Sequence, residues 1–212
     1  DQGSRASTLA KIAPYLQDTQ MREVLNEALA TAREIQDQGS RASTLAKIAP
    51  YLQDNKEALA LAREIQNGEL RARALAEIAP KIQDNKEALA VARGITYEGM
   101  RASALAKTAS KLQDNKEALA VAREITYGGM RASALAEIAS KLQDDQMREV
   151  LDEALAIARG IPYDGLHARA LANIAPQIQD NKEALAVARE IQDEGMRASA
   201  LAKIAPKLQE AQ

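Results

Sequence analysis

Among the residues that could bind an anion, arginine has the most regular spacing. It recurs at the start of the second helix expected in each repeat of this chain, at Arg5, Arg41, Arg71, Arg101, Arg131 and Arg197. A cation at a helix N-terminus opposes the helix dipole, so we expect each guanidinium to have a carboxylate partner. The candidate partners are acidic residues of the neighbouring turns, namely Asp37, Glu98, Asp164 and Glu194. We interpret this arginine ladder as structural; a basic groove for acidic peptide or phosphate is the alternative.

The arginine position of the sixth repeat is occupied by His167, the one histidine of the chain. A lone imidazole provides neither a metal site nor a catalytic triad. The chain has no cysteine, which removes thiolate zinc sites and cysteine nucleophiles. No glycine-rich phosphate loop and no nucleophile motif occurs. We therefore expect no cofactor, no metal ion and no enzymatic activity.

Three tyrosines, Tyr97, Tyr127 and Tyr163, occupy three successive turns. If the repeats stack, these side chains form one exposed aromatic row. Tyrosine is favoured at contact sites because it buries a large area with little loss of entropy. We consider them candidate partner-contact residues, although stacking on one another within the array would explain them equally well.

Two six-residue insertions supply a second set of candidate contact residues. They add the large apolar side chains Met21, Val24, Leu25, Met147, Val150 and Leu151. These residues continue the apolar stripe of the first helix, so we expect long helices over about 20–35 and 146–161, against about eleven residues elsewhere. If the preceding connection covers the added side chains, they brace the array internally. If they remain exposed, they mark a partner or self-association site.

The chemistry-bearing residues recur because the chain is a tandem array. The anchor leucine of each repeat falls at Leu9, Leu45, Leu75, Leu105, Leu135, Leu171 and Leu201, so the spacing is 30 or 36 residues. A fixed period of this size is typical of stacked repeat proteins. The stretch GSRASTLAKIAPYLQD even occurs twice, at 3–18 and at 39–54. We predict an all-α fold, an α-solenoid of antiparallel helix hairpins with about thirteen helices, at least ~70 % helix and no sheet.

Each repeat predicts a first helix, helix A, and a second helix, helix B. In the fifth repeat a capping box, Asp114 with Glu117, opens helix A over 115–125, and helix B follows over about 130–142. Glycine just past helix A suggests a positive φ at Gly39, Gly99, Gly165 and Gly195. Proline inside helix B should kink or restart it at Pro14, Pro50, Pro80, Pro176 and Pro206. The two repeats that have serine there should be straighter.

We treat residues 1–212 as a single repeat array. It begins with a lone helix B over 4–17, and the hairpins follow at about 18–53, 54–83, 84–113, 114–143, 144–179 and 180–209. Each helix A has acidic residues on one flank and basic residues on the other. Parallel stacking would place the acidic edge of one helix A beside the basic edge of the next, and each exposed pair contributes well under ~1 kcal/mol.

Charge and hydropathy disfavour two classes of partner. The net charge of −2 provides no global basic field for nucleic acid or anionic lipid. No apolar run approaches the roughly 20 residues of a membrane span, and no signal peptide is visible, so we expect a cytoplasmic protein. Helical repeats that read one base each need a variable polar pair per repeat. The equivalent positions here are nearly invariant, which makes nucleic acid the least favoured partner.

The segments GMRASALAKIA and DNKEALAVAREI resemble the short HEAT-type repeat. The small-residue hairpin and late proline are also similar to tetratricopeptide repeats, although those have a period of about 34 and a Trp and Gly-Tyr signature that is missing here. Units of the form RAxALAxIAP also resemble arrays attached to bacterial signalling NTPases. These resemblances imply a non-catalytic scaffold that binds a protein or peptide.

Two alternatives to a binding scaffold remain open. The chain could be a self-assembling structural array, built by end-to-end stacking or through the long helices. It could also be an engineered or consensus repeat protein without a ligand, because its repeats are nearly identical.

Overall fold

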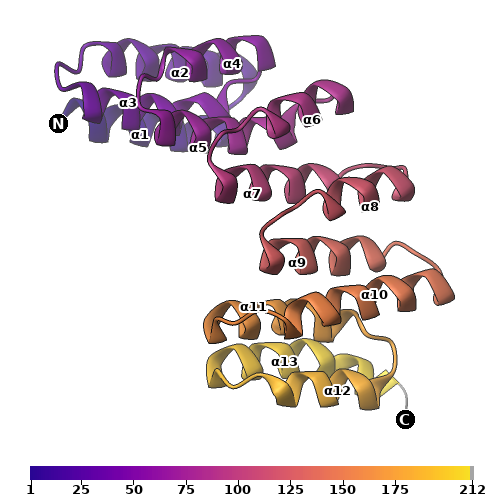
Figure 1. Ribbon diagram of the computed structural model, residues 1–212. Coiled ribbons are helices and arrows are strands. Elements are labelled where there is room, and N and C mark those ends of the chain that lie inside the picture. The colour runs from indigo at the N-terminus through magenta and orange to yellow at the C-terminus, as the bar shows by residue number, and fades with distance from the viewer. Residues whose placement is uncertain (211–212) are drawn as a thin grey trace. The chain divides into compact units, whose positions relative to one another are not determined.

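The computed structural model describes residues 1–210, and α- and 3-10 helices make up 79 % of the chain (Figure 1). These residues form thirteen α-helices and no β-strand, which confirms the predicted all-α array. The A helices are α2 (Asp18–Arg33), α4 (Asn55–Glu64), α6 (Asn85–Arg93), α8 (Asn115–Arg123), α10 (Asp144–Arg159) and α12 (Asn181–Glu190). The B helices are α1 (Gln2–Ile12), α3 (Gln38–Ile48), α5 (Gly68–Ile78), α7 (Glu98–Ala109), α9 (Gly128–Ala139), α11 (Asp164–Ile174) and α13 (Glu194–Glu210).

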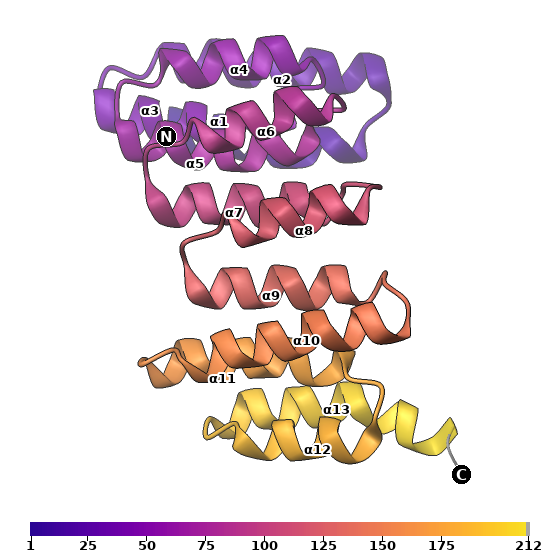
Figure 2. The same cartoon turned by 45° about the vertical axis from the view of Figure 1, so that its right-hand side comes forward.

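The helices gather into two compact units, Asp1–Ala104 and Leu105–Gln212. In the N-terminal unit, α3 packs between α1 and α5, while α2 and α4 cover this layer of B helices. In the C-terminal unit, α11 packs between α9 and α13, and α10 lies against both α9 and α11 (Figure 2). Each unit is therefore built from A helices on one side and B helices on the other.

Small side chains allow the B helices to pack closely. In α9 the residues Ala132, Leu135, Ala136, Ile138 and Ala139 are each at most 1 % exposed. Alanine fills little space, so neighbouring helix axes can approach until leucine and isoleucine from the facing helix fill the gaps. The core of each unit is thus a continuous seam of alanine, leucine and isoleucine between the two layers.

Aspartate opens the short A helices, as the capping boxes predict. The side chain of Asp84 accepts a hydrogen bond from the backbone N–H of Glu87 at 2.8 Å, and Asp180 accepts one from Glu183 at 2.8 Å. The equivalent aspartates Asp54 and Asp114 also cap their helices. These bonds satisfy backbone donors that have no partner inside the helix.

The glycine expectation was wrong. No glycine among the described residues has a positive φ. Gly39, Gly99, Gly165 and Gly195 instead lie in the first turn of a B helix. Helix α4 shows why a left-handed residue is not needed, because it ends on Ile65 in an extended conformation, with φ −72° and ψ 109°. One residue, Gln66, separates this extended residue from Asn67, the N-cap of α5.

Proline ends four of the five B helices that contain it. A 3-10 turn replaces the α-helix at Ala13–Tyr15, Ala49–Tyr51, Ala79–Lys81 and Ala175–Gln177, each with the proline at its start. Where serine stands instead, α7 and α9 continue one residue further, to the alanine. The helix does not restart at Pro206, which lies inside helix α13. After the other four prolines a buried or half-buried leucine or isoleucine turns the chain back toward the next helix A, and no such turn follows Pro206 within the described residues.

The two insertions lengthen helix A as predicted. Helices α2 and α10 each have 16 residues without interruption, whereas α4, α6, α8 and α12 have 9 or 10. Both long helices begin two residues earlier than expected. Each compact unit therefore contains one long helix A.

Candidate functional site

The arginine ladder caps the preceding helix A. Four of its guanidinium groups donate to the backbone carbonyl of the isoleucine six residues earlier, as Arg71 does to Ile65 at 3.0 Å. The other three pairs are Arg41 with Ile35 at 3.3 Å, Arg101 with Ile95 at 3.1 Å and Arg197 with Ile191 at 3.1 Å. Each isoleucine lies one or two residues past the end of helix A, where carbonyls lack partners within the helix. The ladder thus places a positive charge at the negative end of the helix dipole.

The expectation of carboxylate partners for Arg101 and Arg131 was therefore wrong. Within the part of the chain that the structure describes, Arg5 is the ladder member with an ion pair, to Glu27 at 2.5 Å. The turn acid Asp37 has another partner. Asp37 caps α3, and the hydrogen bond from the Ser40 N–H lowers the pKa of its carboxyl below the ordinary value. For Arg41, Arg71, Arg101 and Arg197 a backbone carbonyl oxygen is the acceptor that we expected a carboxylate to provide.

Two ladder positions differ from this pattern. His167 has its Nε2 atom buried without a hydrogen-bond partner, and the Nε atom of Arg131 is in the same state. An imidazole is shorter than an arginine side chain and has fewer donors. The repeat that contains His167 therefore lacks the guanidinium contact that Arg197 makes in the next repeat.

All three candidate contact tyrosines are accessible. Tyr97 is 45 % exposed, Tyr127 41 % and Tyr163 69 %. Tyr97 lies against Gly68, where an added Cβ would be 3.4 Å from the ring. Tyr97 belongs to the N-terminal unit and the other two to the C-terminal unit, so a continuous row of tyrosines stays a prediction.

The insertion residues differ in burial between the two long helices. Met147, Val150 and Leu151 of α10 are only 9 %, 3 % and 5 % exposed. On α2 the equivalent Leu25 is buried, while Met21 and Val24 are half-buried. This burial favours the internal brace for α10, and it leaves part of Met21 and Val24 accessible on α2.

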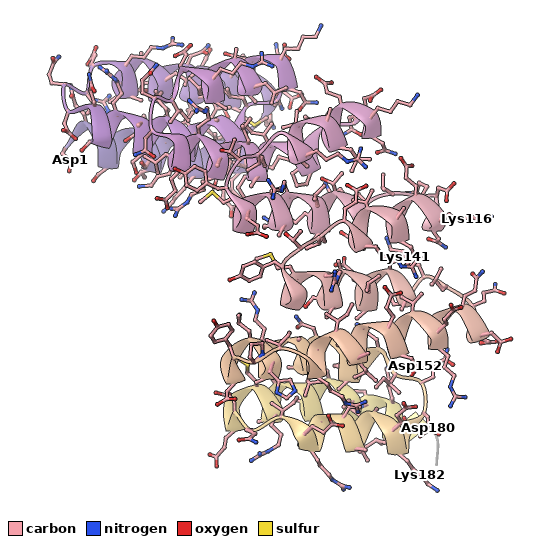
Figure 3. All side chains as sticks on the ribbon, in the orientation of Figure 1. Asp1, Lys116, Lys141, Asp152, Asp180 and Lys182 are labelled. Atoms are coloured by element: carbon pink, nitrogen blue, oxygen red, sulfur yellow. The ribbon has the colours of Figure 1, made fainter. Side chains whose placement is uncertain are left out.

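A groove of about 330 Å³ lies between α10 and the turn that leads into α12. Four apolar side chains contribute to its lining: Met147, Leu151, Leu155 and Ile178. Five acidic side chains and one basic side chain also line it: Asp144, Asp145, Asp152, Asp180, Glu183 and Arg148. Figure 3 shows Asp152 on α10 and Asp180 at the start of α12 on the same side of the molecule. We call this the acidic groove.

A second groove, of about 460 Å³, lies on the other flank of α10, toward α8. Acidic, basic and amide side chains surround it together with a few apolar ones: Asp114, Asn115, Lys116, Leu119, Arg123, Leu142, Gln146, Glu149 and Val150. Lys116, at the N-terminal end of α8, is visible in Figure 3. Because charges of both signs line this mixed groove, it has less preference for a ligand of one sign.

Ion pairs between consecutive A helices confirm the predicted stacking of acidic and basic edges within each unit. Arg33 pairs with Glu64 at 3.6 Å in the N-terminal unit. In the C-terminal unit Arg123 pairs with Glu153 and Arg159 with Glu190, both at 2.7 Å. The hydrogen bond from Arg159 lowers the pKa of the Glu190 carboxyl. These pairs are partly exposed, so each contributes at most about 1 kcal/mol.

A lysine contact between B helices was missed by the sequence interpretation. The Nζ atoms of Lys81 and Lys207 donate to the carbonyls of Pro50 and Pro176, the latter at 2.5 Å. Lys141 donates in the same way to the carbonyl of Ser110. The acceptor lies in the last turn of the previous helix B, and the sequence alone gives no indication of which carbonyl a lysine will reach.

The acidic groove was also missed, although the sequence contains a signal for it. The two long helices differ at a few positions, and at two of these α10 has an acid that α2 lacks. Asp145 stands at the position of Thr19, and Asp152 stands at the position of Asn26. Both acids line the acidic groove. A comparison of the two inserted copies would have shown that charge accumulates beside α10.

Other kinds of site were not found in residues 1–210. No cluster of three histidine or acidic side chains there could hold a metal ion, and none of the helices is long and apolar enough to cross a membrane. A scan against protein-family models and a search of curated proteins found no match to this chain.

Proposed function

We propose that this chain is a non-catalytic scaffold that binds a protein or peptide. The observation that carries the proposal is the long helix α10 with an open groove on each flank. A helix that projects beyond its shorter neighbours leaves concave surface that the array itself does not fill. Polar groups converge there around an apolar floor, which is the usual composition of a binding site.

Exposed aromatic side chains support the same proposal. Tyr127 and Tyr163 belong to the same compact unit as the two grooves and are 41 % and 69 % exposed. Tyrosine contributes binding area and a hydroxyl group at little entropic cost. The resemblance to short HEAT-type arrays, in the form of an α-solenoid, fits this proposal, because it implies a binding scaffold.

Selection from a displayed library of random nonapeptides tests the proposal. We expect a family of related peptides to be enriched and to bind with one peptide per chain, as measured by isothermal titration calorimetry. A chain with Tyr127→Ala and Tyr163→Ala provides a second selection target, and reduced enrichment on it would place the tyrosines in the contact.

The proposal would be contradicted if no peptide were enriched on the immobilised chain beyond the level seen on support without protein. A slow chemical conversion of the bound peptide, followed by mass spectrometry, would contradict its non-catalytic part.

A further inference from the structure

The acidic groove beside α10 has a composition that selects its ligand by charge. It combines five carboxylates with a single guanidinium, that of Arg148. The N-termini of α10 and α12 each contribute roughly half a positive charge, so they offset only about one carboxylate between them. The groove is therefore clearly negative, although the whole chain has a net charge of only −2.

Some of these carboxylates stabilise the fold and others do not. Asp180 belongs to the first group, because it is the N-cap of α12 and accepts a hydrogen bond from the Glu183 N–H at 2.8 Å. Asp145 and Asp152 are exposed residues of α10, and neither forms an ion pair within the described residues. Exposed carboxylates on one groove wall repel each other, and the single guanidinium of Arg148 balances only one of the five. A positively charged ligand would remove this repulsion.

The floor of the groove is apolar and continuous. Met147, Leu151 and Leu155 are four residues apart along α10, so they form one stripe. Ile178 joins the stripe from the turn before α12. A ligand that fits this floor needs apolar side chains between its charges. A volume of about 330 Å³ is at the lower end of the range for ligand pockets, which suits a short segment of extended peptide.

The N-terminal long helix is a natural comparison. Every residue of the acidic groove has an equivalent 126 residues earlier, between α2 and α4. There Thr19 replaces Asp145 and Asn26 replaces Asp152, while Asp18, Asp54 and Glu57 are retained. The two copies therefore have the same three apolar residues along the long helix, with Leu52 in place of Ile178, but they differ by two carboxylates. Exchanging these two residues therefore tests how the charge of the groove affects binding while its apolar residues stay the same.

We propose that the acidic groove binds a short peptide segment in which lysine or arginine alternates with leucine-like side chains. Its cations lie against Asp145 and Asp152, and its apolar side chains contact the stripe from Met147 to Leu155. This inference rests on the proposed scaffold function and gives the chemistry of the partner. A partner of this composition is complementary in both charge and polarity to the groove.

A fluorescein-labelled hexapeptide of alternating lysine and leucine is the probe, with binding measured by fluorescence anisotropy at 50 mM salt. We expect saturable binding with one peptide per chain. The variant Asp145→Thr with Asp152→Asn introduces residues that the α2 copy already tolerates, so it should fold. We expect it to bind the probe about five- to tenfold more weakly. The difference should shrink at 0.5 M salt, where charges are screened within a few ångströms.

The control variant is Glu137→Gln with Glu194→Gln, which removes two carboxylates of the same compact unit that line neither groove beside α10. We expect it to bind the probe within twofold of the unchanged chain. A probe with glutamate in place of lysine should not bind, and one with serine in place of leucine should bind at least about fivefold more weakly. Equal losses in the two double variants would overturn the inference, because binding would then follow net charge alone.

The library selection separates the two proposals. Enriched nonapeptides that lack basic residues would support the scaffold function but contradict the basic-peptide inference. The same conclusion follows if the enriched peptides bind the Asp145→Thr, Asp152→Asn chain with the same affinity as the original chain. If no peptide is enriched and the lysine–leucine probe does not bind, both fail.

Discussion

At the scale of single residues, the guanidinium-to-carbonyl contact recurs at four positions of the chain. Arg71 donates to Ile65 across the turn between two helices, and three other arginines repeat this contact. Hydrogen bonds that involve a charged group are roughly twice as strong as neutral ones. The position was predictable from its repetition, but the acceptor was not. A carbonyl is present at every residue, and only the angle between helices A and B decides which one lies within reach.

We predict that Arg71→Met lowers the stability of the chain by about 1 kcal/mol, because the Ile65 carbonyl loses a charged donor that is partly exposed to water. His167→Arg should have the opposite effect and raise stability by up to about 1 kcal/mol, since it restores a donor for the Ile161 carbonyl. The measurement is the midpoint of urea unfolding followed by circular dichroism.

The control for this pair of changes is Arg73→Met, which removes a more exposed arginine of the same helix and should change stability by less than about 0.5 kcal/mol. Equal effects of Arg71→Met and Arg73→Met would show that the carbonyl contact contributes nothing.

At the scale of the elements, the sequence predicts the helices well because each one begins and ends with a local signal. Asp84 caps α6, and α5 ends at Ile78, two residues before Pro80. Pro206 lies inside α13 although it removes one helical hydrogen bond, so a proline in the sequence does not by itself locate a helix end. The acidic groove depends on how far α10 projects beside α12, which composition and periodicity do not give. Its acids Asp145 and Asp152 have no motif spacing of their own.

The brace of α10 gives a prediction at this scale. Val150→Lys with Leu151→Lys places two charges where the side chains are 3 % and 5 % exposed. We expect a loss of at least about 3 kcal/mol and a melting temperature lower by roughly 6–12 °C, with no change of oligomeric state. Circular dichroism and light scattering measure the two quantities.

Glu149→Lys, at an exposed position of the same helix, is the matched control and should melt within about 2 °C of the unchanged chain. If the double variant melts normally but a dimer or a peptide partner is lost, these residues are a contact surface and the brace is wrong.

At the scale of the whole molecule, one sequence occurs in two environments. Residues 1–18 and 37–54 are identical. Helix α3 packs against α1, α2, α4 and α5, whereas α1 packs against α2 and α3. The difference is large for some side chains, since Ile12 is 44 % exposed and its equivalent Ile48 is fully buried. Stability in an array of this kind comes from contacts with neighbouring repeats as much as from each helix.

We predict that amide hydrogens of 39–54 exchange with solvent at least tenfold more slowly than those of 3–18. Identical sequences have nearly identical intrinsic exchange rates, so the difference measures local opening of the two helices. Residue-resolved exchange by nuclear magnetic resonance checks this, with Ala10 and Ala46 as a matched pair. Equal rates would mean that the additional neighbours of α3 contribute no protection.

The two long helices also matter for how the chain reaches its native structure. Near-identical repeats offer each short helix A several equivalent docking sites, and a slip by one repeat would preserve most contacts while looping out a hairpin. Such misregistered intermediates are kinetic traps. A 16-residue helix cannot exchange places with one of 9 or 10 residues without uncovering its additional apolar side chains. Helices α2 and α10, one in each compact unit, therefore penalise slipped pairings and favour a single alignment of the repeats during folding.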